Sequence, residues 1–150
     1  MNLYNNSLGV EGGKAIGEAL KVNASLTSID VGYNSIGKEE ALSLVAIFKE
    51  NDRMTSVGLA RCELGAEGAA AVADYVRVSA SLTSIDVGFN DVGKEAALSL
   101  VASFKEKDRM TSVGLAGCEL GAEGAAAVAD YVRVSASLTQ VLVFPRRRRL

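Results

Sequence analysis

The spacing of apolar residues changes in a regular way along the chain. Between residues 28 and 32, the apolar Ile29 and Val31 alternate with small or polar residues, which predicts a short strand with one face in a core. From Gly37 onward the apolar positions recur every three or four residues, which predicts a helix with one buried stripe. The residues of that stripe are Ala41, Leu44, Val45 and Phe48.

This strand-then-helix pattern recurs every 28 residues. A leucine or methionine opens each unit, at Leu26, Met54, Leu82, Met110 and Leu138. A fixed period of this length is typical of a solenoid, in which each unit buries its apolar face against its neighbours. We predict a single domain over residues 1–144, followed by a basic tail over residues 145–150. The predicted units are 1–25, 26–53, 54–81, 82–109, 110–137 and the partial unit 138–144.

Residues 26–81 are repeated almost unchanged as residues 82–137. The second units of the two copies differ at one position, Arg61 against Gly117, and the first units differ at six. Likeness that extends to outward-facing positions indicates a recent duplication or a designed sequence. Ile47 in one copy is Ser103 in the other, and we expect this helix flank to be exposed to solvent because it tolerates a polar residue.

Each unit follows the pattern L-x-x-L-x-L-x-x-N/C-x-L, which is filled at Leu26, Ile29, Val31, Asn34 and Ile36. The pattern resembles the leucine-rich repeat. The 28-residue period with a helical second half resembles the ribonuclease inhibitor-like subfamily. The resemblance implies an α/β fold, a right-handed leucine-rich repeat solenoid (horseshoe). Such a solenoid has a parallel β-sheet on its concave face and α-helices on its convex face.

The resemblance also implies a role for the ninth position of the pattern, where the family's Asn turns inward and bonds the backbone of adjoining turns. The residues of this structural ladder are Asn6, Asn34, Cys62, Asn90 and Cys118. Geometry excludes a disulfide, because strands about 4.8 Å apart place cysteines two units apart at roughly 10 Å. We expect both thiols to be buried and reduced, which fits a cytosolic protein.

Two stretches, VGYNSIGKEEAL from Val31 and VGFNDVGKEAAL from Val87, have the glycine and lysine spacing of a phosphate-binding loop. That loop needs a hydroxyl for Mg²⁺ after its lysine, and this chain has Glu39 and Glu95 there. Of the glycines in the first stretch, only Gly37 has a counterpart in every unit, as a turn requires. We therefore predict no nucleotide site and no cofactor.

The charge and composition exclude several classes of function. The chain has 16 basic and 18 acidic residues, and the run Arg146–Arg149 holds four of the basic ones. The remaining body is acidic, which disfavours nucleic acid. The chain has no histidine, which excludes histidine-based catalysis and histidine-containing metal sites. We find no complete set of catalytic groups, so we predict neither an enzyme nor a metal site.

No apolar stretch is long enough to cross a membrane, and we predict no membrane partner. We expect a cytoplasmic protein. If the run Arg146–Arg149 is an import signal, the location is nuclear.

These features favour protein binding. We predict a non-enzymatic leucine-rich repeat interaction module, or a fragment of a larger repeat protein, that binds a protein partner of unknown identity. Binding is expected through the concave strand face and its adjoining loops. The predicted protein-binding residues are Asp30, Tyr33, Arg61, Asp86 and Phe89. The alternatives are a GTPase-activating protein-like regulator and a structural or designed array without a ligand.

The first unit begins inside its strand, so we expect its apolar residues to face outward along the stack. These residues are Leu3, Leu8, Ile16 and Leu20. Uncapped solenoid ends favour association. We predict a two-fold homodimer through this end, because the other end carries the arginine run.

Overall fold

The structure, a computed structural model, describes residues 1–143. Residue 144 and the predicted basic tail, with Arg146–Arg149, lie outside the described residues. Helices and strands alternate along the described part of the chain. The helices are α1 (Gly9–Val22), α2 (Lys38–Glu50), α3 (Gly65–Val78), α4 (Lys94–Glu106) and α5 (Gly121–Val134). The strands are β1 (Ser28–Asp30), β2 (Ser56–Gly58), β3 (Ser84–Asp86), β4 (Ser112–Gly114) and β5 (Gln140–Leu142).

The strands form one parallel sheet in chain order, β1-β2-β3-β4-β5. Each strand residue pairs with its counterpart 28 positions later, for example Ser28 with Ser56. This register aligns the inward-facing residues of all strands in one column. The column is Ile29, Val57, Ile85, Val113 and Val141, of which the first four are fully buried. The N-terminal segment adds a single bridge, between Asn2 and Asp30.

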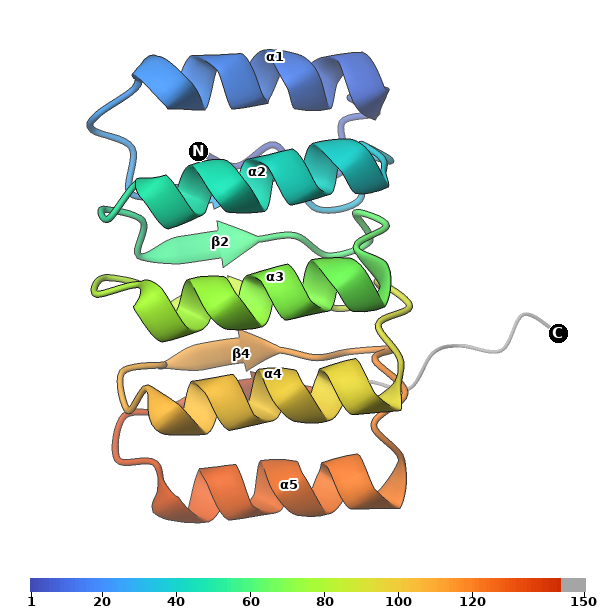
Figure 1. The fold of residues 1–150 in the computed structure, drawn as a ribbon, viewed down its shortest axis with the longest axis vertical. Coiled ribbons are helices and arrows are strands. Elements are labelled where there is room, and N and C mark those ends of the chain that lie inside the picture. The colour runs from blue at the N-terminus through green and yellow to red at the C-terminus, as the bar shows by residue number, and fades with distance from the viewer. Residues whose placement is uncertain (144–150) are drawn as a thin grey trace, which may run out of the picture.

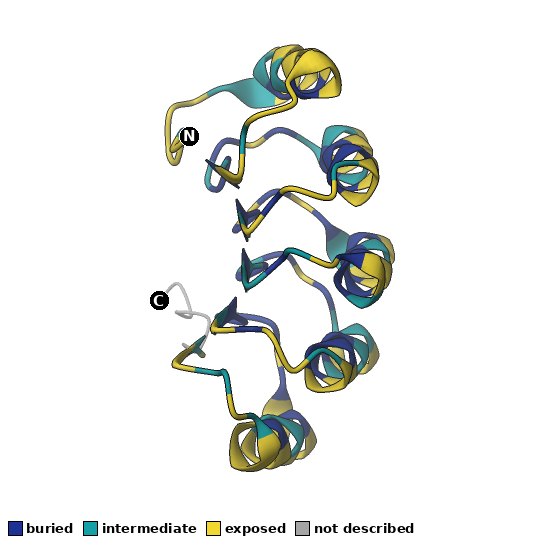
Figure 2. Cartoon of the chain, turned by 90° about the vertical axis from the view of Figure 1, so that its left-hand side faces the viewer, coloured by how far each residue is buried: buried dark blue, intermediate teal, exposed yellow. Residues whose placement is uncertain are grey.

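The helices lie parallel to one another in a second layer, as Figure 1 shows. In the end-on view of Figure 2 the helices form the outer, convex side of a curved stack and the strands form the inner side. Parallel strands require a crossover connection, and here each crossover is the helix of the unit. The predicted α/β repeat solenoid is confirmed.

The apolar stripe predicted from the three- and four-residue spacing is the buried side of α2. All four of its residues are at most 2% exposed, and they join one continuous core with the strand column. The equivalent stripe of α4 is buried in the same way. Helix spacing in the sequence therefore predicted which side of each of these helices faces the sheet.

The expectation that Ile47 and Ser103 lie on an exposed flank is wrong. Ile47 is 8% exposed and Ser103 is fully buried. The Ser103 hydroxyl donates a 2.6 Å hydrogen bond to the carbonyl of Leu100, which satisfies the polar group inside the core. The neighbouring residue in the preceding helix also differs in size between the two copies. A Cβ placed on Gly17 would contact Ile47, whereas the counterpart of Gly17 in the helix before Ser103 is Ala73. Ile47, which is larger than Ser103, thus lies beside Gly17, which is smaller than Ala73.

The expectation that the apolar residues of the first unit all face outward is wrong for Leu20. Leu20 is 5% exposed and belongs to the core. Leu3, Leu8 and Ile16 are half-buried, and Ile16 packs against the same core. Ile16 and Leu20 occupy the helix positions of Leu44 and Phe48, which form the buried stripe of α2.

Candidate functional site

The loops that follow the N-terminal segment and strands β1 to β4 have the same backbone conformation, which contains left-handed residues. In the loop after β1, Tyr33 has φ 57° and Ser35 has φ 48°, on either side of Asn34. Residues other than glycine rarely adopt this conformation, and each instance costs about 1–3 kcal/mol unless the surroundings hold it. The same pair of positions is left-handed in the other units whose loops the structure describes. The pairs are Asn5 and Ser7, Arg61 and Glu63, Phe89 and Asp91, and Gly117 and Glu119.

The side chain of Asn34 holds this loop together. Its carbonyl oxygen accepts from the backbone N–H of Asn6 at 2.7 Å, and its amide donates to the carbonyl of Leu3 at 2.7 Å. It also donates to the carbonyls of Val31 and Gly32 in its own loop. Five hydrogen bonds in total therefore connect two neighbouring loops through one buried side chain.

The other positions of the predicted ladder lie in equivalent places. Asn90 accepts from the N–H of Cys62 at 2.7 Å and donates to the carbonyl of Leu59 at 2.8 Å. The thiols of Cys62 and Cys118 lie 3.7 Å from the carbonyls of Val31 and Val87, respectively. Asn6, in the first unit, is exposed, and its side chain bonds only within its own loop, to the carbonyls of Leu3 and Tyr4. From Asn34 to Cys118, the ninth position of the repeat pattern therefore alternates between an amide that bonds two loops and a small thiol.

Both thiols are free and buried. Burial raises the pKa of Cys62 to about 12, and the carboxylates of Asp30 and Asp86 add to the rise. Burial, with a smaller contribution from Asp86, also raises the pKa of Cys118 to about 12. At neutral pH both groups are therefore thiols, the unreactive form.

Aromatic rings and an arginine gather where the left-handed loops leave the sheet. The rings of Tyr4 and Tyr33 are 5.0 Å apart between centroids, and those of Tyr33 and Phe89 are 6.1 Å apart. The Arg61 guanidinium carbon lies 5.6 Å from the centre of the Tyr33 ring, within cation–π range. We call Tyr4, Tyr33, Arg61 and Phe89 the aromatic–arginine strip.

Three of the five predicted binding residues, Tyr33, Arg61 and Phe89, are thus brought together. Tyr33 and Phe89 are two units apart in sequence, yet their rings approach each other across the loop that carries Arg61. Phe89 in turn leans over Gly117: a Cβ built on that glycine would lie 2.6 Å from the Phe89 ring. Because Gly117 has no side chain, the ring can occupy the place where Arg61 has one.

The other two predicted binding residues, Asp30 and Asp86, form hydrogen bonds within their own turns. Each carboxylate accepts a 2.9 Å hydrogen bond from the N–H two residues later, in Gly32 and Gly88. Each also lies over a glycine of the next strand, so closely that a Cβ on Gly58 would come within 2.5 Å of Asp30. Burial raises the pKa of Asp86, the N–H of Gly88 lowers it, and Asp30 adds a smaller rise. Both carboxylates are half-buried at the edge of the concave face.

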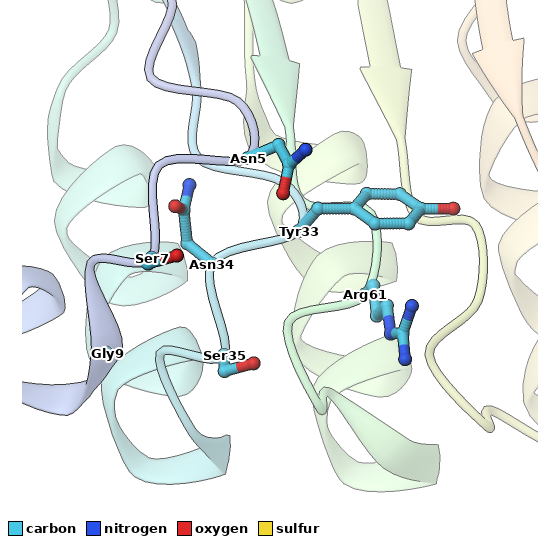
Figure 3. A pocket seen from close by; sticks show the side chains of 7 residues that line it. All are labelled: Asn5, Ser7, Gly9, Tyr33, Asn34, Ser35 and Arg61. Carbon is cyan, nitrogen blue, oxygen red and sulfur yellow. The ribbon is translucent and has the colours of Figure 1, made fainter.

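An open pocket of about 350 Å³ lies beside the strip, at its N-terminal end. Figure 3 shows Tyr33 extending across the Arg61 loop and Asn34 turned toward the N-terminal segment. The pocket is lined by Asn5, Ser7, Gly9, Tyr33, Asn34, Ser35 and Arg61. Sequence reasoning missed Asn5, Ser7 and Ser35 in this role. The signal was available, since Asn5 occupies the loop position of Tyr33 and Arg61 in other units, and Ser7 and Ser35 lie two residues further along the same loop.

The stretches that resemble a phosphate-binding loop adopt the same turn as every other unit. The Lys38 ammonium pairs with Glu67 of the next helix at 2.8 Å, and Lys94 pairs with Glu123. Both lysines therefore connect consecutive helices. Within residues 1–143, His, Cys, Asp and Glu form no group of three that could hold a metal ion. No helix in that range is long and apolar enough to cross a membrane.

Comparisons with known proteins agree with this architecture. The family model described as "Leucine Rich repeat" matches residues 22–45 and 78–101. A comparison with curated protein sequences gives no match. Among solved structures, the leiomodin-1 actin-binding site 2 is similar with a TM-score of 0.74 and 18% identity, over 89% of this chain and 78% of that one.

The tropomodulin C-terminal domain of Caenorhabditis elegans is similar with the same TM-score of 0.74 and 14% identity. That alignment covers 89% of this chain and 81% of the tropomodulin chain. At these identities the two structures show the fold. The matched family model identifies leucine-rich repeats at residues 22–45 and 78–101, and the two structures have a fold that agrees with the repeat pattern of the chain.

Proposed function

We propose that this chain is a non-enzymatic protein-binding module and that it binds through the aromatic–arginine strip and the loops around it. The observation that carries the proposal is where the two near-identical copies differ. Residues 26–81 and 82–137 differ at seven positions, and three of these lie on the loops of the strip. The three differences are Tyr33 against Phe89, Ser35 against Asp91 and Arg61 against Gly117.

Other exposed residues are the same in both copies, such as Glu63 and Glu119, or Lys38 and Lys94. The two halves of the strip therefore differ in chemistry while their backbone stays the same. One half offers a phenol, a hydroxyl and a guanidinium, and the other offers a phenyl ring and a carboxylate. Such a surface can recognise a partner that is itself asymmetric.

The residue types also fit a binding surface. Tyrosine and arginine are enriched among residues that dominate the binding energy of interfaces. Arg61 is exposed and has no carboxylate within 4.0 Å among the described residues, whereas Arg77 and Arg133 have such partners. The left-handed backbone at Tyr33, Arg61 and Phe89 fixes the loops before a partner arrives, which lowers the entropy cost of binding.

The strand face itself offers less to a partner. Its outward residues near the strand ends are glycine, alanine and serine, and the carboxylates of Asp30 and Asp86 are bonded to their own turns. We therefore place the centre of the interface on the loops and treat Asp30 and Asp86 as its border. We also propose that the chain belongs to the ribonuclease inhibitor-like subfamily, on the 28-residue period with a helix in each unit.

The two buried free thiols support an intracellular location, because such cysteines persist in a reducing compartment. Imaging of the tagged chain in its source cell tests the location. Leiomodin-1, which shares the fold, is described by its actin-binding site. Actin is accordingly the first partner to test.

The experiment is co-sedimentation of the full chain with actin filaments, together with a binding titration against actin monomers. The strip variant is Tyr33→Ser, Arg61→Gly and Phe89→Ser, and the control variant is Lys49→Ser and Lys105→Ser on the helices. The proposal expects the strip variant to lose at least about tenfold in affinity while the control retains it.

If actin does not bind, the same three proteins are used for capture from extracts of the source cell. A partner retained by wild type and control but lost by the strip variant supports the proposal. Equal capture by all three proteins contradicts it.

A further inference from the structure

The pocket beside the strip is built by the loops of three consecutive units. The first unit supplies residues 5, 7 and 9, the second supplies residues 33–35, and the third supplies Arg61. The volume of about 350 Å³ is large enough for a side chain of another molecule. All of these walls belong to the described part of the chain, so the shape of the pocket is set within the stack.

The lining of the pocket carries one positive charge and no negative charge. Asn34 is not available to a ligand, because its amide and its oxygen are already used in five hydrogen bonds. The groups that remain include the exposed hydroxyls of Ser7 and Ser35 and the guanidinium of Arg61. The Tyr33 ring, 5.6 Å away, supports that guanidinium, which has no carboxylate within 4.0 Å among residues 1–143. A guanidinium flanked by hydroxyl donors suits a carboxylate, which only accepts hydrogen bonds.

The loops two units further along provide an internal comparison. There both hydroxyls are replaced by carboxylates and the guanidinium is absent. The residues 56 positions after Ser7, Ser35 and Arg61 are Glu63, Asp91 and Gly117. The backbone is nevertheless the same, since φ is 48° at Ser35 and 50° at Asp91. One loop conformation therefore carries a positive lining at the first place and a negative lining at the second.

We propose that this pocket binds the side-chain carboxylate of an aspartate or glutamate in a segment of the protein partner that lies along the strip. Arg61 forms the ion pair with that carboxylate, and the hydroxyls of Ser7 and Ser35 donate further hydrogen bonds. Figure 3 shows the Ser35 hydroxyl turned toward the side on which Arg61 lies. The inference rests on the proposed function, because it names the chemistry of the partner that the strip recognises.

The position of the pocket favours a side chain over a chain end. The pocket lies beside the line of aromatic rings, so a segment that follows the rings reaches it with a side chain. The single charge of Arg61 also matches a carboxylate better than a phosphate, which carries a charge of about −1.5 to −2 at pH 7. Surplus negative charge would be opposed by Glu63, which is exposed two residues after Arg61.

NMR of the full ¹⁵N-labelled chain tests the pocket without its partner. The probe is N-acetyl-glutamate methylamide, whose only charge is the side-chain carboxylate, and the control compound is N-acetyl-glutamine methylamide. We expect the glutamate probe to shift the signals of the Arg61 Nε–H and the Ser35 backbone N–H, with a dissociation constant on the order of a few millimolar, as for other ligands of this size. The glutamine compound is expected to leave both signals in place.

The pocket variant is Ser7→Glu with Ser35→Asp. It introduces the residue types that the chain already carries at Glu63 and Asp91, so the fold is expected to stay unchanged, and it leaves all four residues of the strip in place. The variant is expected to weaken binding of the glutamate probe at least about tenfold, because like charges then face each other. The matched control is Ser25→Glu with Ser43→Asp, which adds the same charge at two exposed serines outside the pocket and is expected to bind like wild type.

Equal shifts with the glutamate and glutamine compounds, or probe binding that survives the pocket variant, overturn the inference. Tighter binding of inorganic phosphate, or of N-acetylglycine as a stand-in for a chain end, also overturns it. Capture of the partner separates this inference from the proposed function. A partner that is lost by Phe89→Ser and by the pocket variant supports both, whereas a partner that is lost by Phe89→Ser and kept by the pocket variant contradicts the carboxylate alone.

Discussion

The ring of Phe89 lies in the space that a side chain on Gly117 would enter, with 2.6 Å between the Phe89 Cδ1 atom and a Cβ built on the glycine. Gly117 and Arg61 occupy the same position of their units, and they are the one difference between residues 54–81 and 110–137. The structure at the two sites therefore differs by which side chain covers the loop: Phe89 at one, Arg61 at the other.

Exchanging these two residues is expected to have unequal effects. Gly117→Arg is expected to destabilise the protein by about 1–3 kcal/mol, because it displaces Phe89 and places a side chain at φ 64°. Arg61→Gly relieves a residue at φ 51° and loses a cation–π contact, so its stability is expected to stay within about 1 kcal/mol of wild type. Urea unfolding measures both variants, and equal destabilisation would contradict the geometry described.

Asn90→Ala is expected to cost about 2–3 kcal/mol, since it leaves several buried backbone groups of two loops without partners. The matched control is Asn6→Ala, at the same position of the first unit, where the side chain is exposed and bonds only its own loop. We expect less than about 1 kcal/mol there. The free energies of unfolding from urea titrations decide the comparison, and similar losses in both variants would show that the amide does not span the loops.

The thiols of Cys62 and Cys118 are expected to react slowly with a disulfide reagent in the folded protein at pH 8 and quickly after unfolding. Their folded pKa is about 12, above the ordinary value of 9.0, so folding favours the protonated thiol. This stabilisation is complete below pH 9 and is lost as the pH rises toward 12. The unfolding midpoint is thus expected to fall above pH 9, and to fall less in a variant with both cysteines changed to alanine. Rapid labelling of either thiol in native buffer would count against their burial.

Ser103→Ile is expected to destabilise the protein by about 1–3 kcal/mol, because the added carbon atoms meet the methyl group of Ala73. Adding Ala73→Gly reproduces the pairing of Ile47 with Gly17 and is expected to recover part of the loss. A double-mutant cycle on thermal or urea unfolding measures the coupling. Strictly additive effects of the two substitutions would mean that these positions do not compensate for each other.

ATP and GTP are expected not to bind, because Lys38 and Lys94 pair with Glu67 and Glu123, and because Glu39 and Glu95 stand where the metal-binding hydroxyl is needed. Titration calorimetry with Mg²⁺ present measures this directly. Micromolar binding that disappears in Lys38→Ala with Lys94→Ala would overturn the assignment of these stretches to a turn.

The periodicity of the sequence was enough to predict the strands, the helices and the buried stripe of α2, because each depends on residues within one unit. The burial of Ser103 was missed for the opposite reason. Comparing Ile47 with Ser103 compares the same position in two units, whereas the packing depends on a different position, Gly17 or Ala73, in the preceding helix. The contact of Phe89 with Gly117 joins the same position of two neighbouring units, and it depends on the absence of a side chain in the second unit. The spacing of apolar residues predicts the helices and strands of one unit, whereas these contacts depend on how neighbouring units pack against each other.

The helix contacts run only between consecutive units, and this has a consequence for how the molecule opens. Loss of one terminal unit removes the contacts of its immediate neighbour and leaves the middle of the stack as it was. We expect the amide protons of β3 and α3 to exchange only when several units have separated, and those of α5 to exchange after one small opening. The interior copy and the terminal copy of one helix sequence thus differ in the time for which they stay folded.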